Sequence, residues 1–299
     1  MRHRLLRSLL LSAGLLLLGY ADLSLGQQLP PEKPPTPAPA ENPPAPAIES
    51  QAERILREMG DYLKARERFT FRVNYSYEIL PYDQKLEFSA TAEVAVDKPN
   101  KLWIDANGDI LQKRFWYDGK TLTVLNVERN QYASTAVSGN LDKMFEYANT
   151  DLGIVLPAAD FAAQDPYAAL SKDVKSGYYI GLYDVDGVNC HHLAFSQSKV
   201  DWQLWIEAGE KPLPKKLVIT YKGIPGVPEY RAIYSHWNFE PKFREGQFTF
   251  TPPEKAVKID FMPATPAKSA SETVSPASAA PAPAAAPPTP STPAPAKSQ

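Results

Sequence analysis

The sequence predicts an α+β protein with a large curled antiparallel β-sheet. The sheet is expected to be an open half-barrel of about 10–12 strands, with an N-terminal helix and a helical insert covering its concave face. Three observations predict this fold. Strand-like runs follow one another through short turns, which favours antiparallel neighbours. Two of these turns, Asp118-Gly119 and Asp186-Gly187, have the dipeptide typical of tight hairpins. The apolar spacing takes a helical period in two regions, residues 48–66 and 140–172.

The prolines divide the chain into parts. Nineteen of the 30 prolines lie in residues 28–47 and 263–299, which have too little apolar bulk to offset the entropy lost on ordering. We therefore expect a Pro-rich disordered linker at 27–47 and an Ala/Pro-rich disordered tail at 263–299. The half-barrel domain is expected to span residues 48–262.

The first 26 residues predict a signal peptide. Arg2, Arg4 and Arg7 form a basic start, and a short leucine-rich run follows them. This run is shorter than the roughly 20 residues that a membrane-spanning helix needs. We expect an exported, periplasmic protein that is cleaved near Gly26 and has no transmembrane span in the mature chain. An uncleaved signal anchor is the alternative.

An amphipathic helix is expected over residues 48–66. Ser50 and Glu53 match a capping box at its start. Apolar side chains recur every three to four positions: Ile48, Ala52, Ile55, Met59 and Tyr62. This apolar stripe is expected to lie on the sheet.

Six strands are expected before the next helix. Apolar residues fall on alternate positions in the first two, so each has one buried and one solvated face. The expected strands are 69–79, 86–96, 102–105, 113–117, 122–127 and 131–137. Residues Asp105 to Asp109 are expected to form a loop after the third strand.

A helical insert is expected at residues 140–172. It should contain one longer helix and two shorter ones, the last beginning at Asp165-Pro166 with aspartate as the cap. The chain then returns to strands that form a meander. The strands expected here are the two runs that flank Asp186-Gly187, then 202–207, 215–221, 230–239 and a last short one at 248–250.

No metal, cofactor or nucleic-acid site is expected. His191 and His192, together with His236, are the best candidates for metal ligands, but adjacent residues of a strand point to opposite faces. The residues from Asp105 to Asp109 match a calcium loop only at its start, because the glycine and the last acidic ligand of such a loop are missing. The net charge is −2, and the sequence contains no long basic stripe that could bind nucleic acid.

No enzyme is expected either. The sequence contains none of the common nucleophile or metalloprotease motifs, and no acidic pair is placed by its spacing for acid–base work. The single cysteine, Cys190, cannot form an internal disulfide, and its apolar neighbours favour burial.

Several segments resemble a known family. They are DVDGVNCHHLAF, DWQLWIEAGEKPLPKKLVITYK and YSHWNF in the second half of the chain, and KPNKL and FWYDGK in the first. These segments resemble a bacterial family of predicted periplasmic proteins with no assigned function. That family is similar to the outer-membrane lipoprotein carriers (the LolA/LolB-like superfamily), which shelter acyl chains in an open half-barrel closed by helices. The resemblance implies this fold and a hydrophobic ligand, and it transfers no catalytic residue.

We therefore expect a periplasmic, non-enzymatic binding or carrier protein for a hydrophobic small molecule, a lipid or the acyl chains of a lipoprotein. The expected ligand-binding residues are Phe71, Tyr75, Val94, Ile104, Phe115, Leu122, Met144 and Phe145. Each buried methylene of an acyl chain would contribute about 0.8 kcal/mol. The alternative is a cell-envelope interaction or sensor protein, with an interior filled by its own side chains and Pro-rich tails that reach partner proteins.

Overall fold

The computed structural model describes residues 47–81, 84–156 and 159–261. All of them belong to the second of the two units into which the chain divides, residues 44–299. The predicted signal peptide, the predicted linker except for its last residue, and the predicted tail lie outside the described residues.

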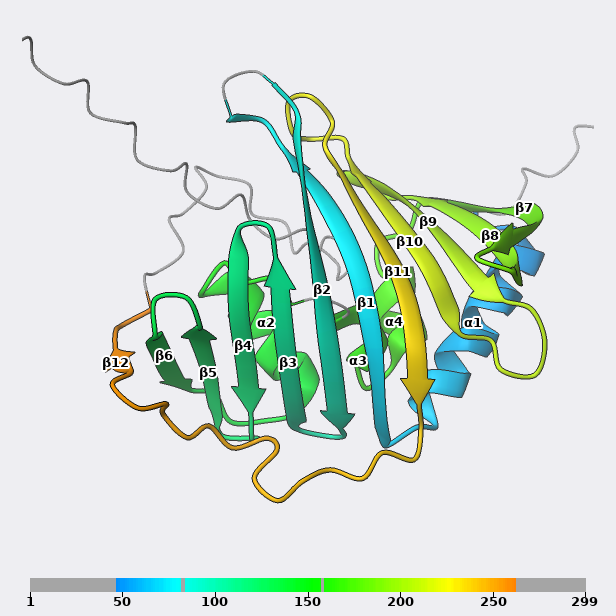
Figure 1. Cartoon of the computed structure of the whole chain (residues 1–299). Helices are drawn as coiled ribbons and strands as arrows, with labels where there is room; N and C mark the ends of the chain where they lie inside the picture. Colours follow the sequence, from blue (N-terminus) through cyan, green and yellow to red (C-terminus); the bar gives the residue numbers. More distant parts are fainter. Residues whose placement is uncertain (1–46, 82–83, 157–158, 262–299) are drawn as a thin grey trace, which may run out of the picture. The chain divides into compact units, whose positions relative to one another are not determined.

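The described residues form one twelve-stranded sheet (Figure 1). Its strands are β1 (Arg68–Ile79), β2 (Leu86–Asp97), β3 (Lys101–Gly108), β4 (Leu111–Tyr117), β5 (Thr121–Asn126), β6 (Gln131–Ala136), β7 (Ser176–Val185), β8 (Val188–Ser196), β9 (Val200–Glu207), β10 (Pro214–Tyr221), β11 (Glu229–Asn238) and β12 (Val257–Lys258). Their order across the sheet is β12-β6-β5-β4-β3-β2-β1-β11-β10-β9-β8-β7. The two meanders, β1 to β6 and β7 to β11, join where β1 pairs with β11. The expected fold class is confirmed.

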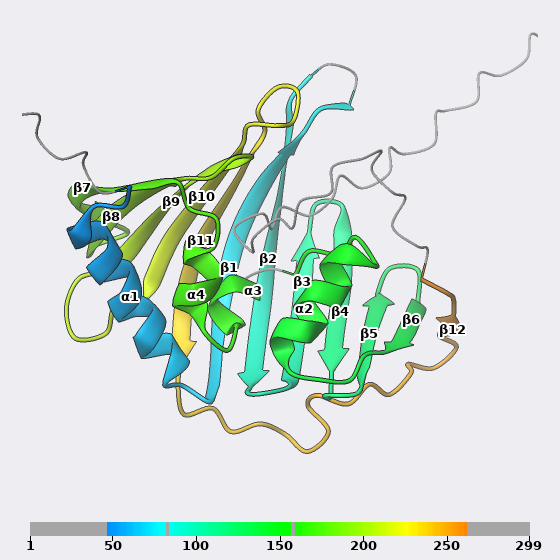
Figure 2. The same ribbon diagram turned by 180° about the vertical axis from the view of Figure 1, so that it is seen from behind.

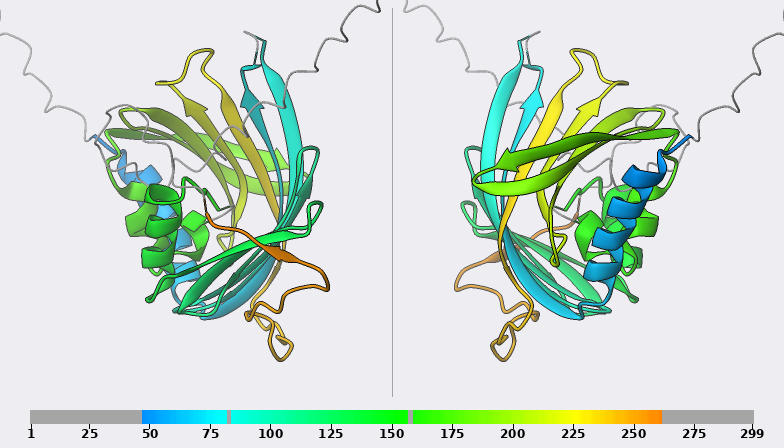
Figure 3. Two further views of the ribbon diagram at one scale, coloured as in Figure 1. Left: turned by 90° about the vertical axis from the view of Figure 1, so that its left-hand side faces the viewer. Right: turned by 90° about the vertical axis from the view of Figure 1, so that its right-hand side faces the viewer.

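Four helices lie on one face of this sheet in the described part of the chain (Figure 2). They are α1 (Ser50–Lys64), α2 (Leu141–Thr150), α3 (Ala159–Ala162) and α4 (Pro166–Ser171). The sheet curves toward them, so they occupy its concave side (Figure 3). Helix α1 lies on the β7–β9 side, α2 lies near β3 to β5, and α3 and α4 lie between these two (Figure 2). We call the sheet face beneath the helices the inner face, and the opposite face the outer face.

Alternation along the strands separates these two faces. In β1, Phe69, Phe71, Val73, Tyr75 and Tyr77 are buried, and the residues between them are exposed or half-buried. Strand β9 repeats this pattern, with every second side chain from Val200 onwards buried. Because side chains of a strand point to opposite faces in turn, one face carries the core and the other contacts solvent.

Helix α1 has the expected apolar stripe but not the expected cap. Ala52, Ile55 and Met59 are buried against the sheet. The predicted capping box is wrong, since the residue before the helix is Glu49 and no side chain caps the helix start. The Glu49 carboxylate instead accepts a hydrogen bond from the backbone N–H of Tyr179 on β7, at 2.9 Å. This acid therefore joins the helix to the sheet.

Both Asp-Gly turns join paired strands, as expected. Val185 pairs with Val188 across Asp186 and Gly187, whose φ angles are 52° and 80°. Two positive φ angles in a two-residue loop match the right-handed twist of the strands. The turn at Asp118-Gly119 joins β4 to β5.

Two expectations about strand ends are wrong. Residues from Asp105 to Gly108 continue β3, where Gly108 pairs with Ala90 of β2, and the turn falls at Asp109-Ile110.

The expected strand 248–250 is absent from the described residues, where Phe248 packs edge-on against Phe243. The last strand is instead the two-residue β12, which pairs parallel with β6. Two residues are too few to show alternation in a sequence.

Within the described ranges, no helix is long and apolar enough to cross a membrane.

Candidate ligand-binding interior

The predicted ligand-binding residues share the inner face and the helix that covers it. Phe71, Tyr75, Val94, Ile104, Phe115 and Leu122 come from β1 to β5, and Met144 and Phe145 come from α2. All but Phe145 are between 0% and 6% exposed and belong to the hydrophobic core. Phe145 is half-buried against that core. The structure thus brings these residues together, and their contact with a bound ligand remains a prediction.

A β-bulge brings an additional aromatic side chain to this face. Both His236 and Trp237 of β11 stand opposite Phe71, because the register shifts between Thr70 and Arg72. His236 has a φ of 55° and is exposed, while Trp237 stacks on Phe71 with ring centroids 4.4 Å apart. An extra residue in one strand re-aims the side chain that follows it. The bulge therefore places Trp237 over one of the predicted ligand-binding residues.

Asp160, in the short helix α3, is an acid in an apolar place. Its side chain is only 2% exposed, and its Oδ1 atom has no hydrogen-bond partner. The next residue, Phe161, packs edge-on against Tyr234 of the sheet, with ring centroids 5.0 Å apart. Burial raises the pKa of Asp160 well above its usual range. Its carboxyl group therefore stays protonated and neutral up to a higher pH than that of an exposed aspartate.

Two buried tyrosines of the sheet, Tyr230 and Tyr234, interact electrostatically with this acid. Tyr230 and Tyr234 of β11 are 3% and 1% exposed, and they share a side-chain hydrogen bond. The ring of Tyr75 lies 5.7 Å from the ring of Tyr230. Burial raises the pKa of Tyr230, and the charges of Tyr234, Tyr75, Tyr221 and Asp160 raise it further. These four tyrosines and Asp160 form a buried polar cluster, which we call the tyrosine–Asp160 cluster.

The cover over the centre of the inner face is made of two short helices, α3 and α4. Polar contacts near the surface join α4 to α1. Lys64 pairs with Asp165 at 2.6 Å, and the Tyr167 hydroxyl lies 2.8 Å from Arg57 and 3.0 Å from Glu53. Exposed pairs of this kind contribute at most about 1 kcal/mol each. Helices of four and six residues are not stable alone, so this cover is held mainly by its packing.

The backbones of α1 and α4 also approach closely. A Cβ atom added to Gly60 of α1 would stand 2.5 Å from the Cβ of Tyr167 and 2.8 Å from its backbone nitrogen. Such distances are shorter than any ordinary van der Waals contact, so only glycine allows this packing. Gly60 therefore sets how closely the cover sits on α1.

His191 and His192 contact neighbouring side chains of the sheet. The His191 ring contacts the Tyr179 hydroxyl at 3.2 Å, and the His192 ring contacts Gln203 at 3.0 Å. His192 also stacks on Trp205 with ring centroids 3.9 Å apart. Burial lowers the pKa of His192. No group of three or more potential metal ligands occurs within the ranges that the structure describes.

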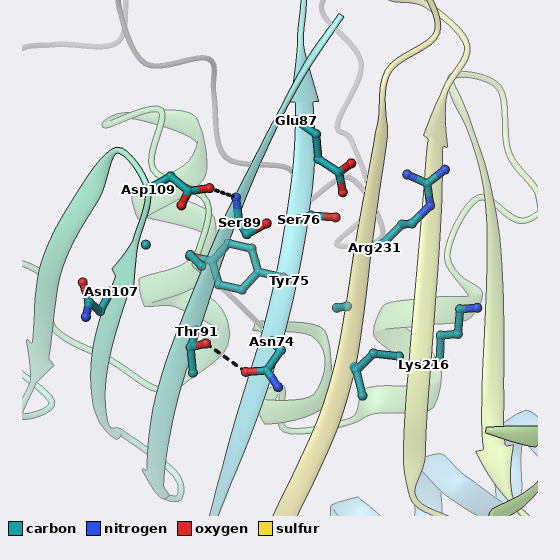
Figure 4. Close-up of a pocket in the computed structure, with 14 residues that line it drawn as sticks. Asn74, Tyr75, Ser76, Glu87, Ser89, Thr91, Asn107, Asp109, Lys216 and Arg231 are labelled. Carbon is teal, nitrogen blue, oxygen red and sulfur yellow. Dashed lines mark hydrogen bonds between the residues drawn. The ribbon is translucent and has the colours of Figure 1, made fainter. Parts of the chain in front are cut away.

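The outer face carries a separate depression of about 480 Å³ (Figure 4). It is lined by Asn74, Tyr75, Ser76, Glu87, Ser89, Ala90, Thr91, Asn107, Gly108, Asp109, Lys216, Arg231, Ala232 and Ile233. Several of its polar groups already have partners: Asn74 bonds to Thr91 at 2.8 Å, and Asp109 accepts the N–H of Ser89 at 2.7 Å (Figure 4). Of the predicted ligand-binding residues, this depression includes only Tyr75.

The sequence reasoning did not identify the tyrosine–Asp160 cluster. A signal was present, since Asp160 is the one charged residue in the stretch LPAADFAA, residues 156–163. An acid within an apolar segment is rarely buried without a purpose. The tyrosines could not be assembled in the same way, because the pairing of β1 with β11 was unknown.

A family model for "Predicted periplasmic protein (DUF2092)" matches residues 52–262 of the chain. The match covers most of the sequence, and the chain belongs to this family. No curated protein sequence matches the chain.

Solved structures with a similar chain course share little sequence with it. An uncharacterized conserved protein from Thermus thermophilus has 12% identity and a TM-score of 0.41, covering 70% of this chain and 99% of that one. LprF from Mycobacterium bovis has 16% identity and a TM-score of 0.38, covering 71% and 100%. A LolA superfamily protein from Nitrosomonas europaea has 11% identity and a TM-score of 0.34, covering 67% and 97%. Similarities of this size do not establish a shared function.

Proposed function

We propose that this member of the DUF2092 family is a periplasmic, non-enzymatic carrier that binds a hydrophobic ligand between the inner face of its sheet and the helices α3 and α4. The ligand would be a lipid or the acyl chains of a lipoprotein. The observation that carries the proposal is a large apolar inner face whose centre is covered by two very short helices. The signal peptide would deliver the protein to the periplasm and would be removed near Gly26.

Binding would proceed by exchange of side chains for ligand. Phe161 and Leu170 of the cover are fully buried against the sheet. If α3 and α4 lift, an acyl chain can take the place of these two side chains and keep the inner face dry. About ten methylenes transferred from water would contribute about 8 kcal/mol, which exceeds the roughly 3–6 kcal/mol lost when Phe161 and Leu170 leave the core. The exposed contacts that hold α4 to α1 add little to that loss.

The proposal is tested first by what the protein carries. Full-length protein purified without detergent is expected to show bound lipid in native mass spectrometry, and delipidated protein is expected to take up a fluorescent fatty-acid probe. An unliganded mass together with no probe uptake would overturn the carrier function.

A matched pair of variants locates the binding surface. Ile104→Thr places a hydroxyl on the inner face, and Ile233→Thr makes the same change on the outer face. Loss of about one methylene of contact predicts roughly fourfold weaker probe binding for Ile104→Thr and no change for Ile233→Thr. Equal affinities of the two variants, each checked for folding by circular dichroism, would place the ligand elsewhere.

A second candidate function is favoured by the edge strand β7. It ends the sheet; Ala47 and Glu49 bond to its outer edge at Gly177 and Tyr179, and the rest of that edge has no neighbouring strand in the described part of the sheet. Tyr178, Ile180, Leu182 and Tyr183 of this strand are each between 45% and 58% exposed. An apolar edge strand can add a strand from another protein, as an envelope interaction or sensor protein would require. Ile180→Lys would then abolish capture of an envelope partner and leave probe binding unchanged.

A further inference from the structure

We propose that the tyrosine–Asp160 cluster recognises the uncharged polar head of an amphiphile, an ester or hydroxyl group, whose apolar chain lies along the inner face. The inference rests on the proposed carrier function and adds the chemistry of the ligand's head. A plain apolar interior would bind acyl chains by length alone. This cluster gives the interior one place where a ligand's hydrogen-bonding group is favoured over another methylene.

The Asp160 carboxyl group has spare bonding capacity. It is buried, and its Oδ1 atom has no partner. A buried polar atom without a hydrogen bond destabilises a protein by about 1–3 kcal/mol, and an apolar side chain of the same shape would remove that loss. Asp160 therefore lowers the stability of the fold compared with an apolar residue at this position. A ligand that bonds to Oδ1 would compensate for its burial.

The neighbouring tyrosines extend this capacity. Tyr230 and Tyr234 share a hydrogen bond, and each hydroxyl can both donate and accept. Tyr234 also contacts Phe161, the residue after Asp160, so the acid and the hydroxyls occupy the same part of the interior. A ligand hydroxyl or ester carbonyl could therefore join an existing network, and this requires no new charge.

The surroundings of Asp160 favour an uncharged head over an anionic one. The groups whose charges interact with this cluster are tyrosines of β1, β10 and β11: Tyr75, Tyr221, Tyr230 and Tyr234. Among the described residues, no lysine or arginine forms an ion pair with Asp160. A carboxylate or phosphate would enter a low-dielectric site without a cation to balance it. The raised pKa of Asp160 agrees with a site that holds neutral groups.

The test compares three amphiphiles that share one saturated chain and differ in the head. They are a monoacylglycerol, a fatty acid and a primary alkylamine, each used to displace the fluorescent probe from delipidated, full-length protein at pH 7. The wild-type protein is expected to bind the monoacylglycerol about tenfold more tightly than the other two, the effect of one good hydrogen bond in a dry site.

Two substitutions at one position test the role of the acid. Asp160→Asn keeps an uncharged donor and acceptor of the same shape, and we expect it to retain the preference for monoacylglycerol. Asp160→Leu keeps only the packing, and we expect it to bind all three amphiphiles with affinities within about threefold of one another. Tyr234→Phe, which leaves the ring on Phe161, should lose part of the preference.

The outcomes separate this inference from the carrier function. If Asp160→Leu binds with the wild-type order of preference, the inference is wrong and the carrier function stands. If the alkylamine binds best and Asp160→Asn abolishes its binding, the site takes a cation and the inference is also wrong. If no amphiphile displaces the probe because no probe binds, the carrier function itself fails. Thermal unfolding of each variant identifies any that does not fold.

Discussion

The two faces of the sheet differ in whether their polar groups have hydrogen-bond or ion-pair partners. On the outer face the polar side chains are in reach of water and pair with one another, as Arg114 does with Asp105 at 2.9 Å. On the inner face, the Oδ1 atom of Asp160 and the indole nitrogens of Trp202 and Trp237 are buried without partners. Unpaired groups weaken the fold, so their concentration on one face indicates that this face was not shaped by stability alone.

The largest effect is expected for one of two tryptophans on the same strand. Trp202 of β9 is fully buried and stacks on Phe195, whereas Trp205 stacks on His192 at the outer face. Trp202→Ala is expected to lower the free energy of unfolding by about 3–5 kcal/mol, and Trp205→Ala by less than about 1 kcal/mol. Urea unfolding followed by circular dichroism measures both. Similar losses would mean that the faces are not distinct.

A smaller effect is expected where the cover meets α1. Gly60→Ala forces the new methyl group into the backbone of Tyr167, so we expect a loss of about 1–3 kcal/mol in the free energy of unfolding and faster probe uptake as α4 is displaced. Gly223→Ala is the control, since no atom lies within 4 Å of its added Cβ. An unchanged uptake rate in a destabilised Gly60→Ala protein would show that α4 does not control access.

The third test uses pH. The pKa of Asp160 is raised above the unfolded value near 3.8, so the folded state binds more protons than the unfolded state, and the free energy of unfolding falls as pH rises between those two pKa values. Asp160→Asn removes this dependence. The variant should match the wild type near pH 3 and exceed its stability by about 1–3 kcal/mol once pH passes the folded pKa.

The control for this pH test lies on the outer face. Asp105→Asn breaks the pair with Arg114 and should cause a loss of less than about 1 kcal/mol in the free energy of unfolding. Chemical denaturation from pH 3 to pH 9 compares the two variants. A stabilised Asp105→Asn protein, or a destabilised Asp160→Asn protein at high pH, would contradict the assignment of unpaired groups to the inner face.

The smallest effect is expected for the outer-face ion pair of Arg72 and Glu93, whose side chains are 44% and 45% exposed. A double-mutant cycle with Arg72→Gln and Glu93→Gln should give a coupling energy below about 1 kcal/mol. The coupling should disappear in about 1 M salt, where screening acts over roughly 3 Å. A larger coupling that persists in salt would mean that the outer face is less solvated than its exposure indicates.

Much of the fold followed from local patterns. Alternation identified β1 and β2, and the Asp-Gly turns fixed two pairs of strands, because both signals depend on residues close in sequence. The pairing of β12 with β6 depends on residues more than a hundred positions apart, and two residues carry no pattern. The continuation of β3 through Asp105 to Gly108 was hidden because its exposed side chains have the composition of a loop.

The site was harder to predict than the fold, for a related reason. The sequence indicated which residues lie on the inner face, since that depends on alternation. It did not indicate that Asp160 would interact electrostatically with Tyr230 and Tyr234, because that depends on how the insert crosses the sheet. Trp237 was also beyond reach, since alternation from Tyr234 places His236 on the inner face, whereas the bulge exposes His236 and turns Trp237 inward.

The bulge at His236 makes the length of β11 as important as its composition. Replacing His236 by another residue that accepts a positive φ leaves the number of residues in β11 unchanged, and Trp237 still stacks on Phe71. If β11 lost the bulge but kept His236, strict alternation would place His236 inward and turn Trp237 into water. Deleting His236 would instead leave Trp237 two residues after Tyr234, so it would stay on the inner face opposite Phe71. A relative that lacks this one residue could therefore keep the same interior without a bulge.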